Sequence, residues 1–560
     1  MRFKNFVRRG FVQFTVAVAL VCFLLGVGAA QRRTQTPRRG TAVERQSPSQ
    51  RGARPTRGAR LSPPLLAALE RISAGSLRAH LSFLASDALE GRATPSRGLD
   101  VAAEYIASQF RRAGLEAVGD DGYFQTANWQ TRERSLEGFE MRLSVPDAPE
   151  VGVERSEVSL SYEMMGQTLW SVENALSLER APVVKVDFQD AAALAALTES
   201  QLGGRVVVTE LPDFQRVERS RWQETYRAQN AFLARLMALK AALVVAVNRN
   251  EAKGRGTGSQ RLIDPERQTA QSGAAATRPA VVGVHSPAAV RLYDALKAGE
   301  TNATVSLRVP AQSEKQVKVR NVVGLLRGSD PALEGTYVIL SAHYDHIGTL
   351  PEGTPGDRVF NGANDDASGT VTVVEVASTL SALKPRPKRS ILFVTFFGEE
   401  KGLLGSRFYG RHPVVPIEQT VAQVNLEQVG RTDDSEGAQI STASVTGFDY
   451  SDVGEILRAA GEATGVRVYK HPQNSDAFFG RSDNQSLADQ GVPAHTLGVA
   501  FEFPDYHALG DEWQKIDYAN MEKIARTVAL GLINIANNPQ APRWNEANPK
   551  TERYRKARMK

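Results

Sequence analysis

The sequence predicts an α/β fold of three layers, α/β/α, with a mostly parallel mixed sheet and a second, smaller α/β domain inserted into it. Two observations carry this prediction. From about Val319, short β-branched runs alternate with amphipathic helical segments, which is typical of βαβ units. Several of these runs end in turns rich in His, Asp or Glu. Because the carboxyl ends of parallel strands meet at one edge of a sheet, we expect a ligand site there.

The segments of the main domain are predicted as follows. Helices begin at Pro64, and LDVAAEYIASQFRRAGLEA has apolar residues at helical spacing and ends at Gly114. After residue 318 the predicted strands are NVVGLL, TYVILSA, SILFVTFF, TVAQVNLE and AHTLGVA, and the predicted helices are GTVTVVEVASTLSAL, SDVGEILRAAGEATG and MEKIARTVALGLINIAN. Residues 64–130 are therefore the first part of this domain and residues 319–538 its main part, and the basic tail 539–560 is predicted to fray.

Residues 131–318 differ in character and predict the inserted domain. Its strands are VVKVDF, RVVVTEL, ALVVAVN and AVVGVH, with a long helix in SRWQETYRAQNAFLARLMALKAAL, and residues 250–278 are polar and loop-like. No group of His or acidic residues follows its strands, and His285 is predicted to be structural or at the surface.

The N-terminus predicts export. At 560 residues, the chain is long enough for two or three domains. Residues 1–30 have the basic start, apolar middle and small residues of a signal peptide, and residues 31–63 form a basic linker predicted to be disordered. We expect a periplasmic or extracellular protein without a stable membrane span, or a membrane-tethered one if the signal is not cleaved. The only cysteine, Cys22, lies in the signal, so disulfides are not expected.

Net charge gives no support to nucleic-acid binding. Residues 1–62 hold thirteen Lys and Arg and one acidic residue, so the remaining chain carries a net charge of −6. The basic character belongs to the N-terminal arm and not to a folded surface. We therefore expect no nucleic-acid partner.

The candidate site lies in residues 341–406, in the pieces SAHYDHIG, NGANDDASGT and FFGEEKGLLGS. The ionisable candidates there are His343, Asp345, His346, Asp365, Asp366, Glu399 and Glu400. That many charges at buried strand ends would be costly without a cation, so the sequence predicts a metal site. Two residues from later in the chain complete it: Glu427 ends another strand, and His507 follows an aromatic loop.

These motifs resemble the family of co-catalytic dizinc aminopeptidases, which includes bacterial leucyl aminopeptidases and glutamate carboxypeptidase. The resemblance covers residues about 76–130 and 318–537, through HLSFLASDALEGR, HYDHIG, NGANDDASGT, GEEKGLLGS, NLEQVGR and YHALGDEWQKID in that order. It implies a zinc-aminopeptidase fold. The inserted segment looks like a protease-associated domain, which often interrupts this fold.

The resemblance also implies roles for particular residues. His343 and Glu427 match the ligands on one metal's side, Asp365 matches a bridging aspartate, and Glu400 and His507 match the ligands of the other metal. Glu399 matches the general base, and Asp345 matches the residue that orients His343. Two divalent ions, Zn²⁺ in the first place, would then activate water, and Mn²⁺ or Co²⁺ would also suit these N and O ligands.

The implied function is an exported zinc-dependent exopeptidase, an aminopeptidase that releases N-terminal residues from peptides. Several alternatives stay open. A carboxypeptidase of the family would want a basic pocket, for which Arg431 and Arg481 are candidates. A glutaminyl cyclase has one zinc and fewer ligands, and a non-catalytic binding protein would have lost ligands. The oligomeric state is open.

The chain departs from the family pattern at two places. Glu427 stands where Asp is common, and Ser482-Asp483-Asn484 replaces Ser-Asp-His, which puts specificity in question more than chemistry. Phe478, Phe479 and Phe501 are expected either to line a substrate pocket or to be core. The remaining candidates are set aside: Asp366 is expected behind the ligands or as a helix N-cap, His346 is outside the matched set, and His80, His412, His471 and His495 are expected to be structural or exposed.

Overall fold

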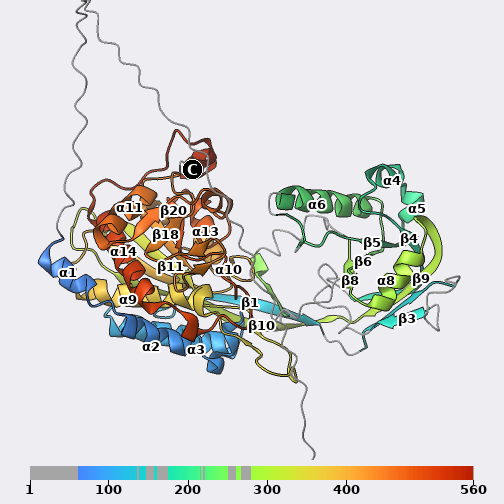
Figure 1. Cartoon of the computed structure of the whole chain (residues 1–560), viewed down its shortest axis with the longest axis horizontal. Coiled ribbons are helices and arrows are strands. Elements are labelled where there is room, and N and C mark those ends of the chain that lie inside the picture. The colour runs from blue at the N-terminus through green and yellow to red at the C-terminus, as the bar shows by residue number, and fades with distance from the viewer. Residues whose placement is uncertain are drawn as a thin grey trace, which may run out of the picture. The chain divides into compact units, whose positions relative to one another are not determined.

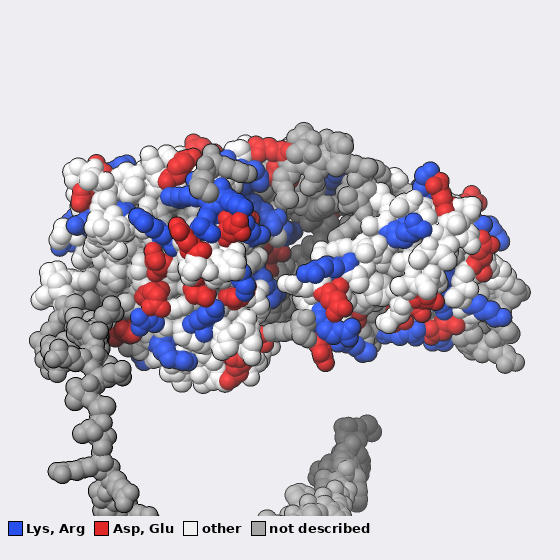
Figure 2. Space-filling model, turned by 90° about the horizontal axis from the view of Figure 1, so that it is seen from above, with Lys and Arg blue, Asp and Glu red and all other residues white. Residues whose placement is uncertain are grey.

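The structure, a computed structural model, describes residues 61–134, 138–146, 157–160, 175–214, 216–218, 221–249, 260–266 and 279–558. The predicted signal peptide and nearly all of the predicted linker lie outside these residues. Within them, no helix has both the length and the apolar character needed to cross a membrane. On the face in Figure 2, acidic and basic side chains are interspersed.

A nine-stranded mixed sheet forms the middle layer of the main domain (Figure 1). Its order is β19 (Arg467–Tyr469), β18 (Thr442–Val445), β20 (Ala494–Gly498), β15 (Thr420–Glu427), β11 (Tyr337–His343), β14 (Ser390–Phe396), β10 (Gln312–Leu326), β1 (Phe124–Arg134) and β7 (Gln260–Ile263). The four central strands from β20 to β14 run parallel, and antiparallel pairs flank them on both sides. The predicted mixed α/β fold is confirmed.

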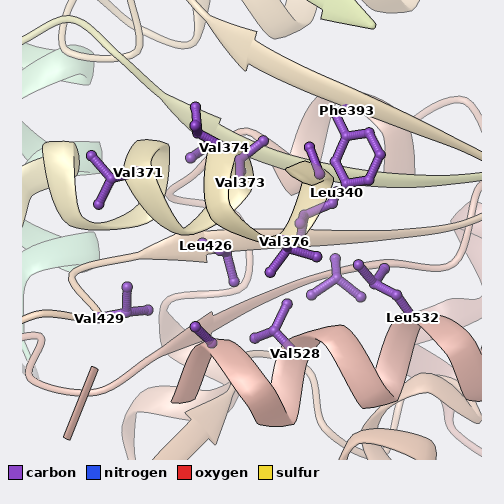
Figure 3. Close-up of a cluster of buried hydrophobic side chains, with 14 of the residues drawn as sticks. Leu340, Val371, Val373, Val374, Val376, Phe393, Leu426, Val429, Val528 and Leu532 are labelled. Carbon is purple, nitrogen blue, oxygen red and sulfur yellow. The ribbon is translucent and has the colours of Figure 1, made fainter. Parts of the chain in front are cut away.

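Helices cover both faces of this sheet. One face packs against α2 (Ala74–Leu84), α3 (Arg97–Arg112), α9 (Ser368–Ala382), α11 (Val453–Thr464) and α14 (Tyr518–Asn537). The other packs against α10 (Leu404–Arg411) and α13 (Asn484–Ala488). Successive side chains of each strand point to opposite faces of the sheet. Leu340 therefore lies in the first core and Ile339 in the second. Figure 3 shows side chains of the strands, α9 and α14 meeting in the first core.

Helix α9 is apolar on nearly every side. Its residues from Ser368 to Ala377 are all buried, because it lies between the sheet and the helices α2, α3 and α14. A helix that is hydrophobic all round is typical of a core position. Since α9 begins three residues after Asp365, the core fixes the loop that carries this carboxylate.

A second, seven-stranded sheet lies in the predicted insert. Its order is β3 (Glu157–Leu160), β2 (Glu140–Ser144), β9 (Gly299–Val309), β4 (Leu176–Lys185), β5 (Val206–Glu210), β6 (Leu243–Val247) and β8 (Val281–Val284). With α6 (Trp222–Ala238) and α8 (Pro287–Ala295), it has apolar clusters of its own. The main sheet takes more of this region than we expected, because it includes β7, the end of β1 and the start of β10.

The prediction that the C-terminal tail frays was wrong. Trp544 and Tyr554 are buried and stacked with ring centroids 4.9 Å apart, and α15 (Glu552–Arg558) ends the described chain. Both rings contact Phe479 in the second core. The basic composition of the tail concealed two widely spaced aromatic anchors.

His495 lies fully buried beside these aromatic rings. Its Nε2 is 2.6 Å from Ser451 Oγ, and its Nδ1 is 2.9 Å from the carbonyl oxygen of Thr446. Burial lowers the pKa of His495 to about 4, although the Thr446 carbonyl opposes this effect. The expectation that His495 is structural agrees with these contacts.

This burial predicts a pH-dependent stability. An unfolded histidine takes up a proton below about pH 6.5, whereas folded His495 does so only near its pKa of about 4. Protons therefore favour the unfolded chain between these values, and stability falls as the pH falls from 6.5 to 4. We expect the stability advantage of wild type over His495→Gln to shrink by about 3 kcal/mol across this window in chemical denaturation. Parallel pH profiles for the two proteins would contradict this account.

Candidate metal centre

The predicted site residues converge at the carboxyl ends of the central strands. His343 ends β11, Glu427 ends β15, and Glu399 and Glu400 follow β14. Asp365 comes from the loop before α9, and His507 comes from the loop after β20. Parallel pairing of β11 with both β14 and β15 brings these strand ends side by side.

One group of ligand-type atoms consists of His343, Asp365 and Glu427. His343 Nε2 lies 3.2 Å from Asp365 Oδ1 and 3.6 Å from Glu427 Oε2. All three side chains are buried, and one ligand atom from each fits within 4.8 Å of the others. The resemblance assigns His343 and Glu427 to the first metal's side and Asp365 to the bridging position.

A second group lies on the other side of Asp365. His507 Nε2 is 3.1 Å from both Asp365 Oδ2 and Glu400 Oε2, as the resemblance implies. His346 joins this group, because its Nδ1 lies 2.8 Å from Glu400 Oε1. We had placed His346 outside the ligand set, yet His346, Asp365 and Glu400 also bring ligand atoms within 4.8 Å of one another.

Unpartnered polar atoms indicate that the two groups suit metal ions. His343 Nε2, His346 Nδ1 and Nε2, and Glu400 Oε1 are buried and form no hydrogen bond of regular geometry, although His346 Nδ1 and Glu400 Oε1 lie only 2.8 Å apart. Buried polar atoms are normally satisfied, so such atoms need an explanation. Imidazole nitrogens and carboxylate oxygens are the donors that Zn²⁺ accepts. The residues present therefore fit divalent cations.

The electrostatics of the two groups follow from burial and close pairing. Burial opposes ionisation of Asp365, but His343 and His507 hold its pKa well below the usual range. Burial and Asp365 oppose ionisation of Glu400 as well, and His346 and His507 lower its pKa to about 2. The same two carboxylates raise the pKa of His507 to about 10 against the effect of burial. The carboxylates thus raise the pKa values of His343 and His507 against the effect of burial.

Glu399 differs from its neighbour. Burial raises the pKa of Glu399 well above its usual range; His343 opposes this shift, and Glu427 and Glu400 add to it. A carboxyl group with a raised pKa, placed beside ligand-type residues, is suited to taking up and returning a proton.

Asp345 links His343 to the Glu399 backbone. The His343 Nδ1 lies 3.1 Å from the Asp345 carbonyl oxygen and 3.5 Å from its Oδ1. Asp345 Oδ1 also accepts a hydrogen bond from Glu399 N at 3.1 Å, and its Oδ2 accepts one from Thr94 Oγ1 at 3.1 Å. This geometry agrees with the orienting role that the resemblance implies. Thr94, which the sequence analysis missed, completes the connection because its Oγ1 accepts from Gly398 N at 3.1 Å.

Asp366 and Asp511 hold the loop of the shared aspartate. Asp366 Oδ1 accepts hydrogen bonds from Gly369 N in the first turn of α9 and from Gln428 N, while Ala367 occupies the N-cap position of that helix. Asp511 accepts from Asn364 N at 2.9 Å and from Asp365 N at 3.1 Å. Sequence reasoning missed Asp511, although it lies in the matched stretch YHALGDEW.

Arg92 was also missed. It is fully buried at a positive φ of 49° and donates to the carbonyl oxygens of Tyr344, Asn361 and Gly362 at 2.8, 2.7 and 3.0 Å. The guanidinium thereby joins the HYDHIG turn to the NGANDDASGT loop. Arg92 ends the sequence LEGR, which adjoins no predicted strand, so the sequence did not indicate this role.

The late loop supports Glu427. Ser482 Oγ donates to Glu427 Oε1 at 2.5 Å, and Asn425 Nδ2 donates to Ser482 Oγ at 2.8 Å. The adjacent Asp483 is fully buried, and burial raises its pKa to about 7. Asn484, in the position of the family's histidine, donates to the Phe479 carbonyl oxygen at 2.9 Å.

The candidate pocket residues separate into two kinds. Phe479 is core, whereas Phe478 and Phe501 are partly exposed with ring centroids 5.6 Å apart. The remaining histidines lie away from the ligand groups. His80, His412 and His471 face Tyr105, Glu266 and Glu436 at 2.8, 2.8 and 2.7 Å.

Comparison with known proteins agrees with this geometry. Residues 321–531 match the sequence profile of Peptidase family M28. The M28 segment contains every candidate ligand, and the resemblance inferred from the motifs is confirmed. The protease-associated identity of the insert stays a prediction.

The relatives are similar over part of their length. A probable zinc metalloprotease of Pyrenophora teres f. teres (strain 0-1) is 32% identical over 257 residues, which are 42% of this chain and 53% of the relative. A probable leucine aminopeptidase 2 of Aspergillus oryzae is 24% identical over 290 residues, 46% of this chain and 52% of the relative. The chain thus spans about half the length of these curated relatives.

Solved structures share the fold. An aminopeptidase from Aneurinibacillus sp. strain AM-1 superposes with a TM-score of 0.56 at 19% identity, over 86% of this chain and 97% of that one. A zinc aminopeptidase from Bacillus subtilis gives 0.52 at 18% identity, over 84% and 97%. At these identities the likeness concerns the fold alone.

The contact between Ser482 and Glu427 gives a prediction. Partners that orient a metal ligand typically contribute about 10–100-fold to metal affinity. We therefore expect Ser482→Ala to weaken zinc binding by about tenfold in a competition titration, while the thermal midpoint of the metal-free protein changes little. Ser486→Ala is a matched control, since its hydroxyl pairs with Ser406 and not with Glu427. Equal zinc affinity in both variants would remove Ser482 from this role.

Proposed function

We propose that this chain is an exported, zinc-dependent exopeptidase, and most specifically an aminopeptidase that releases N-terminal residues from peptides. One observation carries the proposal. The two ligand groups share Asp365, and Glu399 lies beside them with a raised pKa. The match of residues 321–531 to Peptidase family M28 supports the reaction class, and the names of the relatives support zinc and the aminopeptidase assignment.

The proposed ligands are the five residues that the motifs indicated: His343 and Glu427 on one side, Glu400 and His507 on the other, and Asp365 between them. His346 is a sixth candidate through its contact with Glu400. Two bound divalent cations would supply polarisation of the scissile carbonyl and a lowered pKa for the attacking water.

The protein's own residues perform the remaining steps. The Glu399 carboxylate takes the proton of the attacking water and returns it to the leaving amine. Asp345 fixes the Glu399 backbone and the His343 ring together, which holds the base at a constant position relative to the ligands. The His507 side chain is 37% exposed, so it lies on the solvent side of the proposed ligand set.

The rival functions differ in the parts they need. A binding protein on this fold would have no use for five converging ligands and an adjacent base. A single-zinc cyclase would leave one of the two groups without a purpose. A carboxypeptidase stays the nearest alternative, and the assays below separate it from an aminopeptidase. We also propose that residues 1–30 direct export and that the second sheet is a protease-associated domain.

Replacement of the base tests the mechanism. General acid–base assistance is worth about 10²–10⁴-fold, so Glu399→Gln is expected to lower kcat by that factor. Zinc content, measured by elemental analysis, stays near wild type because Glu399 is not a proposed ligand. Wild-type turnover in this variant would be incompatible with the proposed base.

Reporter peptides test the reaction itself. We expect the wild-type chain to release amino-terminal residues from aminoacyl reporters, and a chelator to abolish this activity. Release of carboxy-terminal residues would favour the carboxypeptidase, and cyclisation of glutaminyl peptides would favour the cyclase. A metal-free protein with no hydrolysis would favour the binding protein.

A further inference from the structure

Two arginines near the candidate centre have opposite environments. Arg431 is 4% exposed and fully engaged, with its Nε 2.6 Å from Asp433 Oδ1 and its Nη1 2.9 Å from Asp505 Oδ2. Two carboxylates neutralise this guanidinium, so it has no free charge for a substrate. Because Asp505 lies two residues before His507, Arg431 instead anchors the loop of that histidine.

Arg481 is exposed and forms no ion pair with any residue that the structure describes. Its guanidinium carbon lies 4.8 Å from the centre of the Phe478 ring. Stacking on an aromatic face holds a guanidinium in place and leaves its edge donors free for a planar anion. Arg481 is therefore a positioned cation without an anionic partner among the described residues.

Two aromatic rings connect Arg481 to the end of β20, where Gly498 pairs with Glu427 of β15. The Phe478 ring meets Phe501 edge to face, with centroids 5.6 Å apart. Phe501 covers Gly498, because a Cβ on that glycine would lie 2.3 Å from Phe501 Cζ and 2.9 Å from the Glu427 carbonyl oxygen. The residue after Arg481 is Ser482, which donates to Glu427 at 2.5 Å. Both the ring contacts and the backbone thus lead from Arg481 to a proposed ligand.

We propose that Arg481 binds a carboxylate of the substrate, so that the chain acts on peptides that carry a carboxylate close to the scissile bond. This inference rests on the proposed function. The centre itself is rich in carboxylates, namely Asp365, Glu399, Glu400, Glu427 and Asp483. These carboxylates would repel an acidic substrate. The positive charge of Arg481, beside the aromatic rings, would offset that repulsion. In this proposal the rings of Phe478 and Phe501 contact the aliphatic part of the substrate residue that carries the carboxylate.

Two sources would present this carboxylate. One is the side chain of an acidic N-terminal residue, and the other is the α-carboxylate of a dipeptide. Both offer two oxygens to the fork of a guanidinium, so the same charge-assisted pair forms with either. The experiment therefore has one arm for each source.

The kinetic test compares Arg481→Gln with wild type in the zinc-loaded full chain. One arm uses glutamyl and leucyl p-nitroanilides, and the other uses Leu-Gly and its C-terminal amide. We expect kcat/KM on the carboxylate-bearing substrate of one arm to fall by about tenfold, and the neutral substrates to keep their values. The arm that responds identifies the source. Arg481→Lys is expected to restore part of the loss.

Arg467→Gln is the matched control, because Arg467 is an exposed arginine stacked 4.2 Å from the centre of the Tyr469 ring on the edge strand β19. It should leave all four substrates unchanged. An equal loss on neutral and acidic substrates in Arg481→Gln, or no loss on either, would overturn the role of Arg481.

A binding measurement separates this inference from the proposed function. Calorimetry on Glu399→Gln, with and without Arg481→Gln, measures the affinity for uncleaved Leu-Gly, glutamyl amide and their neutral counterparts. Arginine-dependent binding without wild-type hydrolysis would reject the function and keep the carboxylate site. Hydrolysis of neutral substrates without arginine-dependent binding would do the reverse. Absence of both would reject the two together.

Discussion

The concentration of negative charge at the ends of β11, β14 and β15 is the constraint on which the rest of this structure depends. Asp365, Glu427 and Asp483 are buried, and the side chain of Glu400 is only 8% exposed. Like charges at this separation in a poorly solvated site cannot all ionise without nearby positive charge. The histidines provide part of that charge and hold down the pKa values of Asp365 and Glu400, whereas burial raises those of Glu399 and Asp483. Cations would provide the rest.

Such a site needs a rigid frame, and here the frame consists of backbone contacts. Arg92 ties two loops together through their carbonyl oxygens, and Asp511 ties the Asp365 loop through its amides. Below them, α9 is buried on nearly all sides, so its N-terminal end cannot shift without disturbing the first core. The position of the shared carboxylate is thus determined by apolar packing on one side and by hydrogen bonds on the other.

The sequence predicted the parts of this site that are local in the chain. His343, Asp365, Glu399 and Glu427 each lie beside a β-branched run or a glycine-rich turn, and their place at a strand end could be inferred from those neighbours. Thr94, Asp511 and Ser482 act across 251, 146 and 55 residues of chain, respectively, and no local pattern reveals such contacts. The same limit explains β7, a four-residue strand inside a polar stretch that only pairing with β1 stabilises. His346 shows the opposite error. Its spacing in HYDHIG suited a ligand, but the family pattern does not include it, and we therefore left it out.

The proposed ligands differ in how their carboxylates are held in place. Glu427 has a longer side chain than an aspartate at the same position would have. Asp365 has the short side chain, and its two oxygens face His343 at 3.2 Å and His507 at 3.1 Å, so its backbone sets the separation of the two groups. Glu400 and Glu427 have longer side chains, and each carboxylate has a partner. His346 lies 2.8 Å from Glu400, and Ser482 donates a hydrogen bond to Glu427. A glutamate in place of the family's aspartate adds one rotatable bond and thus more freedom for the carboxylate. The hydrogen bond from the Ser482 hydroxyl restricts that freedom. The substitution and the serine therefore work as a pair: the late loop that carries Arg481 toward the substrate also fixes a ligand of the centre.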